Sequence, residues 1–197
     1  MSRVVVIGGG LGGLAAAARL AGGGHAVTVL EAAEVVGGKL GTTELDGYRF
    51  DTGPSLLTMP HVLERLFADT GAPLSSVLAL ERLDVAARYR FGDGTVLDLP
   101  GERRDVPAAL DAALGAGAGA QWASFLDHAE RVWAVTREPF LESPVSAAAL
   151  ARLSLRVGDL RAVAPWRTLR RAGARHLHDP RLRMLLDRYA TYSGSDP

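Results

Sequence analysis

The feature that most constrains this chain is a glycine-rich turn between a short apolar run and an alanine-rich segment. Residues 4–7 are β-branched and apolar, which is typical of a strand buried on both faces. The turn that follows carries three glycines in the spacing G-x-G-x-x-G: Gly8, Gly10 and Gly13. A helix is predicted over residues 14–21, and a second buried strand over residues 26–30 closes on Glu31. This order of elements is the one that a dinucleotide-binding βαβ unit needs.

Each residue of the turn has a physical reason to be there. Gly8 allows a sharp turn out of the strand, Gly10 lets the backbone approach a pyrophosphate, and Gly13 lets the helix pack close to the sheet. Leu11 and Gly12 complete the predicted binding turn. A pyrophosphate would rest there on the free N–H groups of the helix N-terminus, where the helix dipole favours negative charge.

The acid at the end of the second strand predicts which dinucleotide fits. The Glu31 carboxylate can accept hydrogen bonds from both hydroxyls of an adenosine ribose. The same carboxylate would repel a 2′-phosphate by like charge. A free dinucleotide or a flavin dinucleotide therefore fits the predicted site, whereas NADP does not.

The start of the chain also has an alternative interpretation. Residues 1–20 follow the order of a secretory signal peptide, with Arg3 before an apolar stretch and small residues. A signal peptide, however, requires neither three glycines at fixed spacing nor an acid after a following strand, so we prefer the dinucleotide interpretation. No transmembrane helix is predicted, because outside the glycine-rich start there is no uninterrupted apolar segment of about 18 residues.

Composition excludes several function classes. The chain has 197 residues and no cysteine, which rules out disulfides, thiolate metal sites and a cysteine nucleophile and fits a cytoplasmic protein. Its formal net charge is zero, and no nucleic-acid partner is predicted. Arginines exceed acids in residues 151–197. Because Lys39 is the only lysine, we attribute part of this excess to composition rather than to a phosphate-binding surface.

Two further motifs follow the predicted βαβ unit. Val-Gly-Gly-Lys ends at Gly38 and Lys39, where glycine would allow close backbone approach beside a ligand and lysine would supply a positive charge. The alternative for this motif is a glycine turn with a solvated lysine. Asp-Thr-Gly-Pro follows at residues 51–54, and an Asp-Gly pair at residues 46–47 between the two motifs predicts the turn of a β-hairpin.

Together these strings resemble the amine-oxidase superfamily of flavoproteins and, within it, the bacterial-type phytoene desaturases. The resemblance rests on V-V-V-I-G-G-G-L-G-G-L, V-L-E, V-G-G-K and F-D-T-G-P-S, and it extends to the ending over residues 179–197. It covers nearly all of this chain but only the N-terminal portion of such proteins. It implies FAD as the cofactor.

The resemblance also implies a role for each cofactor-binding residue. The glycines of the first turn would hold the FAD pyrophosphate, and Glu31 would bind the adenosine ribose. Gly38 and Lys39 would line the flavin site. The D-T-G-P segment would lie close to that site with three residues: Asp51, Gly53 and Pro54.

Beyond residue 60 the chain alternates helical and strand patterns. A helix is predicted over residues 60–71, with proline near its start and glycine past its end. Alternating apolar residues over 83–91 and 97–99, separated by an Asp-Gly turn, predict an antiparallel hairpin. Helical spacing then predicts helices over residues 105–114 and 122–136, with a small-residue linker at 115–120 between them. A helical stretch interrupted at Pro165 is predicted over residues 160–177, and a last helix starts at Asp179-Pro180.

The histidines predict no metal site. His176 and His178 are two apart and would face different ways on a helix. His25, His61 and His128 are isolated in the sequence and are interpreted as structural or solvated. No catalytic base is identified.

The predicted fold class is α/β. A Rossmann-like FAD-binding βαβ domain is expected over residues 1–75, part of an antiparallel substrate sheet over 76–104, and a helical substrate- or membrane-facing region over 105–197. Because the resemblance covers only the N-terminal portion of the family, we expect a truncated chain. A missing C-terminal portion or a complementing chain would supply the rest.

The resemblance implies that the complete protein is an FAD-dependent desaturase of a long apolar polyene, a phytoene-like carotenoid, acting by hydride transfer to flavin. The apolar helix faces are interpreted as core or as the wall of a lipid tunnel, and the arginines would suit anionic head groups. A cytoplasmic protein with peripheral contact at the inner face of the cell membrane is expected. The alternatives are an amine or porphyrinogen oxidase of the same superfamily and a non-catalytic nucleotide-binding fragment.

Overall fold

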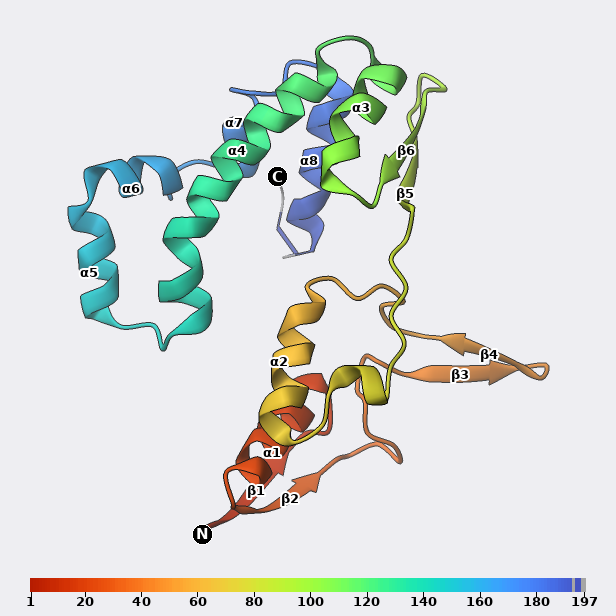
Figure 1. Cartoon of the computed structure of the whole chain (residues 1–197), viewed down its shortest axis with the longest axis vertical. Coiled ribbons are helices and arrows are strands. Elements are labelled where there is room, and N and C mark those ends of the chain that lie inside the picture. Colours follow the sequence, from red (N-terminus) through yellow and green to blue (C-terminus); the bar gives the residue numbers. More distant parts are fainter. Residues whose placement is uncertain (193, 196–197) are drawn as a thin grey trace. The chain divides into compact units, whose positions relative to one another are not determined.

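A computed structural model describes residues 1–192 and 194–195 of the chain. It divides into two compact units, Met1–Glu81 and Arg82–Pro197, and each is described here by itself. Both contain strands and helices, so the chain has a mixed α/β composition (Figure 1).

The first unit begins with a parallel βαβ arrangement. Strand β1 (Arg3–Ile7) leads into helix α1 (Leu11–Gly22), and strand β2 (Ala26–Leu30) returns parallel to β1. The register pairs Arg3 with Ala26 and Ile7 with Leu30, so both strands end at the same edge. The predicted strand, helix and strand are therefore confirmed, although α1 begins three residues earlier than residue 14.

The prediction that these two strands are buried on both faces is wrong. Side chains alternate between half-buried and exposed along each strand. On the exposed face Val5 is 59%, Ile7 87% and Leu30 54% accessible. The physical reason is that this described sheet has only two strands, with α1 packed on one side of it. Among the described residues of this unit, Leu74 is the one buried large apolar side chain.

A hairpin and a helix complete the first unit. Strands β3 (Thr42–Leu45) and β4 (Tyr48–Asp51) pair antiparallel, as predicted. Residues 46 and 47, an Asp-Gly pair, form the turn with positive φ angles of 52° and 80°, as the tightest hairpin turns require. Helix α2 (Pro60–Thr70) follows, with Pro60 at its start and Gly71 after its end. It packs on α1, and the short 3₁₀ turn η1 (Leu74–Ser76) comes after it.

The second unit starts with an antiparallel hairpin and continues with helices. Strands β5 (Val85–Arg90) and β6 (Val96–Pro100) form the predicted hairpin. The 3₁₀ turn η2 (Arg103–Asp105) leads into two packed helices, α3 (Val106–Leu114) and α4 (Ala118–Arg137), and α4 passes into a π-helical turn η3 (Glu138–Glu142). Figure 1 shows α4 as a long helix with α3 on one side and, farther along, two shorter helices: α5 (Ala147–Leu155) and α6 (Val157–Val163). Helix α8 (Pro180–Thr191) starts at the predicted Asp-Pro pair, and the short helix α7 (Leu169–Gly173) packs on it.

Two sequence-based boundaries in this unit are wrong. The small-residue linker predicted at 115–120 is shorter, because α4 already begins at Ala118. Ala118 and Gly119 are buried against α3, and a Cβ on Gly119 would lie 2.2 Å from the Pro107 carbonyl oxygen. Small residues therefore mark a close helix–helix contact here rather than a loop. The helical stretch predicted over 160–177 is interrupted at Pro165 as predicted, but its outer bounds differ, because α6 begins at Val157 and α7 ends at Gly173.

The apolar core of the chain lies in this second unit. It joins the inner face of the β5–β6 hairpin to three helices, and its most deeply buried side chains are Leu97, Leu110, Leu177 and Leu182. Arg181 ties α8 to the hairpin and to α3, because its guanidinium donates to Asp179, Thr95 and the Leu114 carbonyl oxygen. No helix among the described residues is long and apolar enough to cross a membrane.

His128 is isolated in the sequence but has a partner in space. Its ring stacks on that of His176, with centroids 5.4 Å apart and planes at 21°. The pair comes from α4 and from the segment after α7, so the contact depends on tertiary packing. His178 does not share it, and its backbone N–H donates to the Gln121 side chain.

Candidate functional site

The glycine turn of the first unit brings strand β1 and helix α1 unusually close together. Gly8 has a φ angle of +100°, which favours glycine, and its N–H donates to the Leu30 carbonyl oxygen at 2.7 Å. A Cβ on Gly13 would lie 1.9 Å from the Gly8 carbonyl oxygen and 3.6 Å from a methyl group of Val6. No larger residue fits at position 13 without backbone movement.

The N-terminus of α1 presents free hydrogen-bond donors. Gly10 is the N-cap residue in an extended conformation without a side chain to cap the helix, and its carbonyl oxygen accepts from the Leu14 N–H at 2.9 Å. The N–H groups of Gly12 and Gly13 donate to no acceptor among the residues that the structure describes. Two free backbone donors at the positive end of a helix dipole form a site suited to an anion.

Glu31 lies directly beside this turn. Its carboxylate accepts hydrogen bonds from the Gly9 N–H and, at 2.9 Å, from the Ala33 N–H. These backbone hydrogen bonds, of which the one from Ala33 has the largest effect, hold the pKa of Glu31 below its usual value. The side chain is therefore ionised at neutral pH. Each carboxylate oxygen keeps a second lone pair that can accept from a ligand hydroxyl.

Sequence reasoning missed the part that Gly9 plays. Besides the N–H bond to Glu31, a Cβ at this position would lie 2.8 Å from a methyl carbon of Val36 and 3.1 Å from a Glu31 carboxylate oxygen. Gly9 is one of the variable positions in G-x-G-x-x-G, so the motif gave no signal for it. Only the approach of Glu31 and Val36 in space makes glycine necessary there.

The Val-Gly-Gly-Lys motif adds a third backbone segment to the turn. Gly37 pairs with Gly10 in a parallel bridge, and its N–H donates to the Gly9 carbonyl oxygen at 2.8 Å. A Cβ on Gly38 would lie 3.1 Å from the Gly10 Cα. The adjacent glycines of the sequence therefore allow two loops to touch backbone to backbone.

The Asp-Thr-Gly-Pro motif also lies against this loop. A Cβ on Gly53 would lie 2.0 Å from the Lys39 carbonyl oxygen, so these two segments are in direct contact. Asp51 pairs with Thr42 in the β3–β4 hairpin, and Pro54 follows at the surface. Among the described residues, the structure gives neither Asp51 nor Pro54 a hydrogen bond to the glycine turn.

The arrangement as a whole is suited to binding. It combines backbone donors for an anion, an ionised carboxylate for hydroxyl groups and glycines that allow close approach. In the part of the chain that the structure describes, no group of three or more His, Cys, Asp or Glu side chains is placed to hold a metal ion.

Comparison with known proteins gives a consistent picture. The family model described as flavin-containing amine oxidoreductase matches residues 11–178. Similar curated proteins include a phytoene dehydrogenase of Streptomyces griseus, 37% identical over 100% of this chain and 39% of its own length. A hydroxyneurosporene desaturase of Rhodobacter capsulatus is 38% identical over 98% of this chain and 40% of its own length. A 4,4'-diapolycopene oxygenase of a Methylomonas species is 35% identical over 99% of this chain and 39% of its own length. The chain thus spans about two fifths of the length of the curated relatives it matches.

Proposed function

Because this chain belongs to the family of flavin-containing amine oxidoreductases, we propose that its first unit is the Rossmann-like, adenosine-binding part of an FAD site. We propose further that the complete protein is a carotenoid desaturase. The observation that carries the second proposal is the extent of the likeness. Relatives named for reactions on carotenoids match 98–100% of the chain, far beyond the glycine motifs that flavoproteins share.

The residues of the glycine turn fit FAD on physical grounds. The free N–H groups of Gly12 and Gly13, with Leu11 beside them, would hold the pyrophosphate, and Gly8 and Gly10 shape the turn so that it can approach. The first N–H groups of a helix lack intrahelical acceptors, and no side chain caps α1, which supports this assignment.

Glu31 would hold the adenosine ribose. Its ionised carboxylate can accept from the two ribose hydroxyls, and its charge disfavours the 2′-phosphate of NADP. Gly38 and Lys39 would line the site toward the flavin ring, and the contact of Gly53 with Lys39 supports placing Asp51, Gly53 and Pro54 near it.

When bound, FAD would supply the two-electron acceptor for desaturation: a hydride leaves one carbon of the polyene for the flavin and a proton leaves the neighbouring carbon, so that a double bond forms. The role of this chain is to hold and orient the adenosine half of the cofactor. We assign no residue of the chain to the proton transfer.

We propose that further polypeptide, a continuation of this chain or a complementing chain, covers the open face of the β1–β2 sheet. Val5, Ile7 and Leu30 on that face would otherwise remain in water, and exposed apolar patches mark interaction surfaces. The substrate would be a long apolar polyene drawn from a membrane. We place the protein in the cytoplasm, in peripheral contact with the inner face of the cell membrane.

The pigments of a suitable host test the proposed reaction. The complete reading frame that contains this chain, expressed in a host that accumulates phytoene, is expected to produce new absorption bands at longer wavelength, because each new double bond extends the conjugated system. Extracted pigments would be separated and their spectra recorded, with a vector lacking the frame as control. Unchanged phytoene beside a folded, flavin-loaded protein would contradict the proposal.

A second candidate reaction is oxygenation of a carotenoid, since the similar Methylomonas protein is named as an oxygenase. A parallel host that accumulates a fully conjugated acyclic carotenoid separates the two. An oxygen-containing product there, with phytoene unchanged in the first host, would favour the oxygenase.

A further inference from the structure

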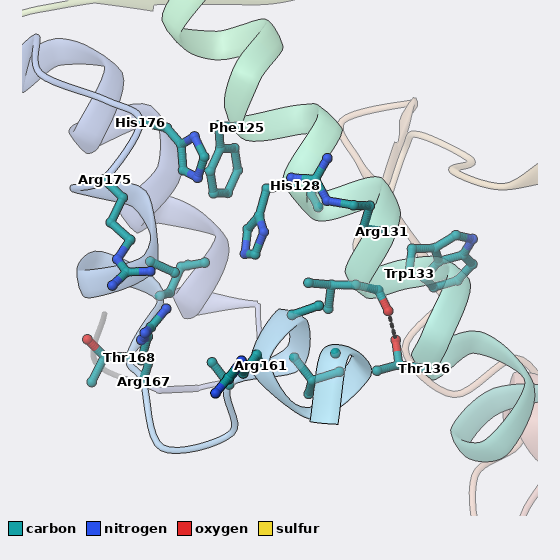
Figure 2. Close-up of a pocket in the computed structure, with 18 residues that line it drawn as sticks. Phe125, His128, Arg131, Trp133, Thr136, Arg161, Arg167, Thr168, Arg175 and His176 are labelled. Carbon is teal, nitrogen blue, oxygen red and sulfur yellow. Dashed lines mark hydrogen bonds between the residues drawn. The ribbon is translucent and has the colours of Figure 1, made fainter. Parts of the chain in front are cut away.

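The second unit contains a cavity of about 750 Å³ that the flavin proposal does not use. Helix α4 forms one wall, and α6, α7 and the segments after each of them form the other (Figure 2). Its volume lies in the range of small-molecule sites, roughly 300–1,000 Å³.

Four arginines line this cavity without an anionic partner. Arg131 comes from the α4 wall, and Arg161, Arg167 and Arg175 come from the opposite wall, as Figure 2 shows. Within the described residues none of the four forms an ion pair, and no Asp or Glu lines the cavity. Arg170, a neighbouring arginine outside the cavity, is paired with Asp187 at 2.8 Å. Arg167 is half-buried and the other three are exposed, so their shared positive charge is open to an anion that enters the cavity.

The stacked histidines lie in the same positive field. His128 and His176 both line the cavity, and the Ser124 hydroxyl is hydrogen-bonded to His176 Nδ1 at 2.9 Å. Burial, then the charge of His176 and then the surrounding arginines lower the pKa of His128. The arginine charges that disfavour a proton on His128 would also attract an anion into the cavity.

The remaining wall is apolar. Phe125, Val132, Val163 and Leu169 line the cavity with the arginines. The space is therefore larger and more apolar than a free phosphate ion needs. An anionic group could lie among the guanidinium groups while an attached hydrocarbon contacts these side chains.

We propose that this cavity binds the phosphate group of an amphiphile, with the phosphate held by Arg131, Arg161, Arg167 and Arg175 and the hydrocarbon against the apolar wall. Arginine suits this role because its planar guanidinium donates two hydrogen bonds at once to phosphate oxygens. The site lies wholly within the second unit, and it stands independently of the proposed flavin site. The phosphate can belong to a bilayer phospholipid or to a soluble phosphate ester.

Calorimetric titration of the chain with decyl phosphate, below its micellar concentration, tests the site. Decyl phosphate is expected to bind about tenfold or more tightly than inorganic phosphate, because only the ester also fills the apolar part. Decyltrimethylammonium is expected not to bind. Equal binding of the cationic and anionic amphiphiles would overturn the proposal, since an apolar patch alone would then explain both.

Paired variants locate the binding. Arg167→Gln with Arg175→Gln is expected to weaken decyl phosphate binding about tenfold or more, since charge-assisted hydrogen bonds to phosphate are lost. The lysine pair at the same positions keeps the charge and is expected to recover part of the affinity. Arg171→Gln is the matched control, because Arg171 is an exposed arginine of α7 outside the cavity. An equal loss in the Arg171 control, or no loss in the double glutamine variant, would contradict the site.

Vesicles identify the source of the phosphate. Co-sedimentation with phosphatidylglycerol vesicles but not with phosphatidylcholine vesicles, lost in the double glutamine variant, would assign the site to anionic bilayer lipid. Binding of decyl phosphate without any vesicle binding would assign it to a soluble phosphate ester. Either result supports the cavity as a phosphate site, and failure of both probes to bind refutes it whatever the outcome for flavin.

Discussion

Gly13→Ala is expected to destabilise the glycine turn by about 3 kcal/mol, the upper range for forcing extra atoms into a packed site. The added Cβ would lie 1.9 Å from the Gly8 carbonyl oxygen, so the backbone of either α1 or the turn must move. The same movement would displace the free N–H groups that we assign to the pyrophosphate. Hydrogen exchange of residues 3–30, read by mass spectrometry, would report the loss locally.

Gly12→Ala is the matched control for this change. Gly12 is the preceding residue of the same helix, and a Cβ there has no atom within 4 Å. Alanine is favoured over glycine in a helix by as much as about 1 kcal/mol, so this variant is expected to keep or gain protection. If Gly13→Ala exchanged as slowly as Gly12→Ala, the close approach of α1 and β1 would be contradicted.

Glu31→Ala is expected to weaken FAD binding by about 1–3 kcal/mol, because the ribose hydroxyls would lose their charged acceptor. FAD affinity would be measured in the protein from the complete reading frame by flavin fluorescence. Glu34→Ala removes an exposed acid three residues away and is expected to leave the affinity unchanged.

Glu31 also accepts hydrogen bonds from the Gly9 and Ala33 N–H groups, so its removal affects the free protein as well. Glu31→Gln separates the two roles, since glutamine keeps one acceptor oxygen but not the charge. We expect this variant to bind FAD more weakly than the unchanged protein does. We also expect its preference for FAD over NADP to be smaller, because the carboxylate that repels the 2′-phosphate is gone. Unchanged FAD affinity in both Glu31 variants would refute the assignment of the ribose to this residue.

Local sequence signals predicted those parts of the structure that depend on short-range chemistry. The Asp-Gly pairs gave both hairpin turns, because positive φ angles are needed there and few residue types accept them. The Asp-Pro pair gave the start of α8, where Asp179 caps the helix by accepting from the Arg181 N–H. In the candidate site the glycine spacing predicted the turn and the acid beside it.

The sequence did not predict features that depend on which segments meet in space. A β-branched run indicates a strand but not how many layers cover it, and so the exposed face of β1 and β2 was missed. The run of small residues before Trp122 is typical of a linker in the sequence, and only the approach of α3 explains it as a helix contact. Arg131 and Arg175 are far apart in the chain, and each looks like an ordinary solvated arginine until folding places both on one cavity.

The central claim is that the N-terminus of α1, with Glu31, holds the adenosine half of FAD. Hydrogen exchange of this chain with and without millimolar FAD, at short labelling times, tests it most directly. We predict that FAD slows exchange at Gly12 and Gly13, whose N–H groups donate to no acceptor among the described residues, leaves the first turn of α4 unchanged, and protects more than NADP does. Exchange at these two residues that FAD does not alter, or that NADP slows equally, would contradict the claim.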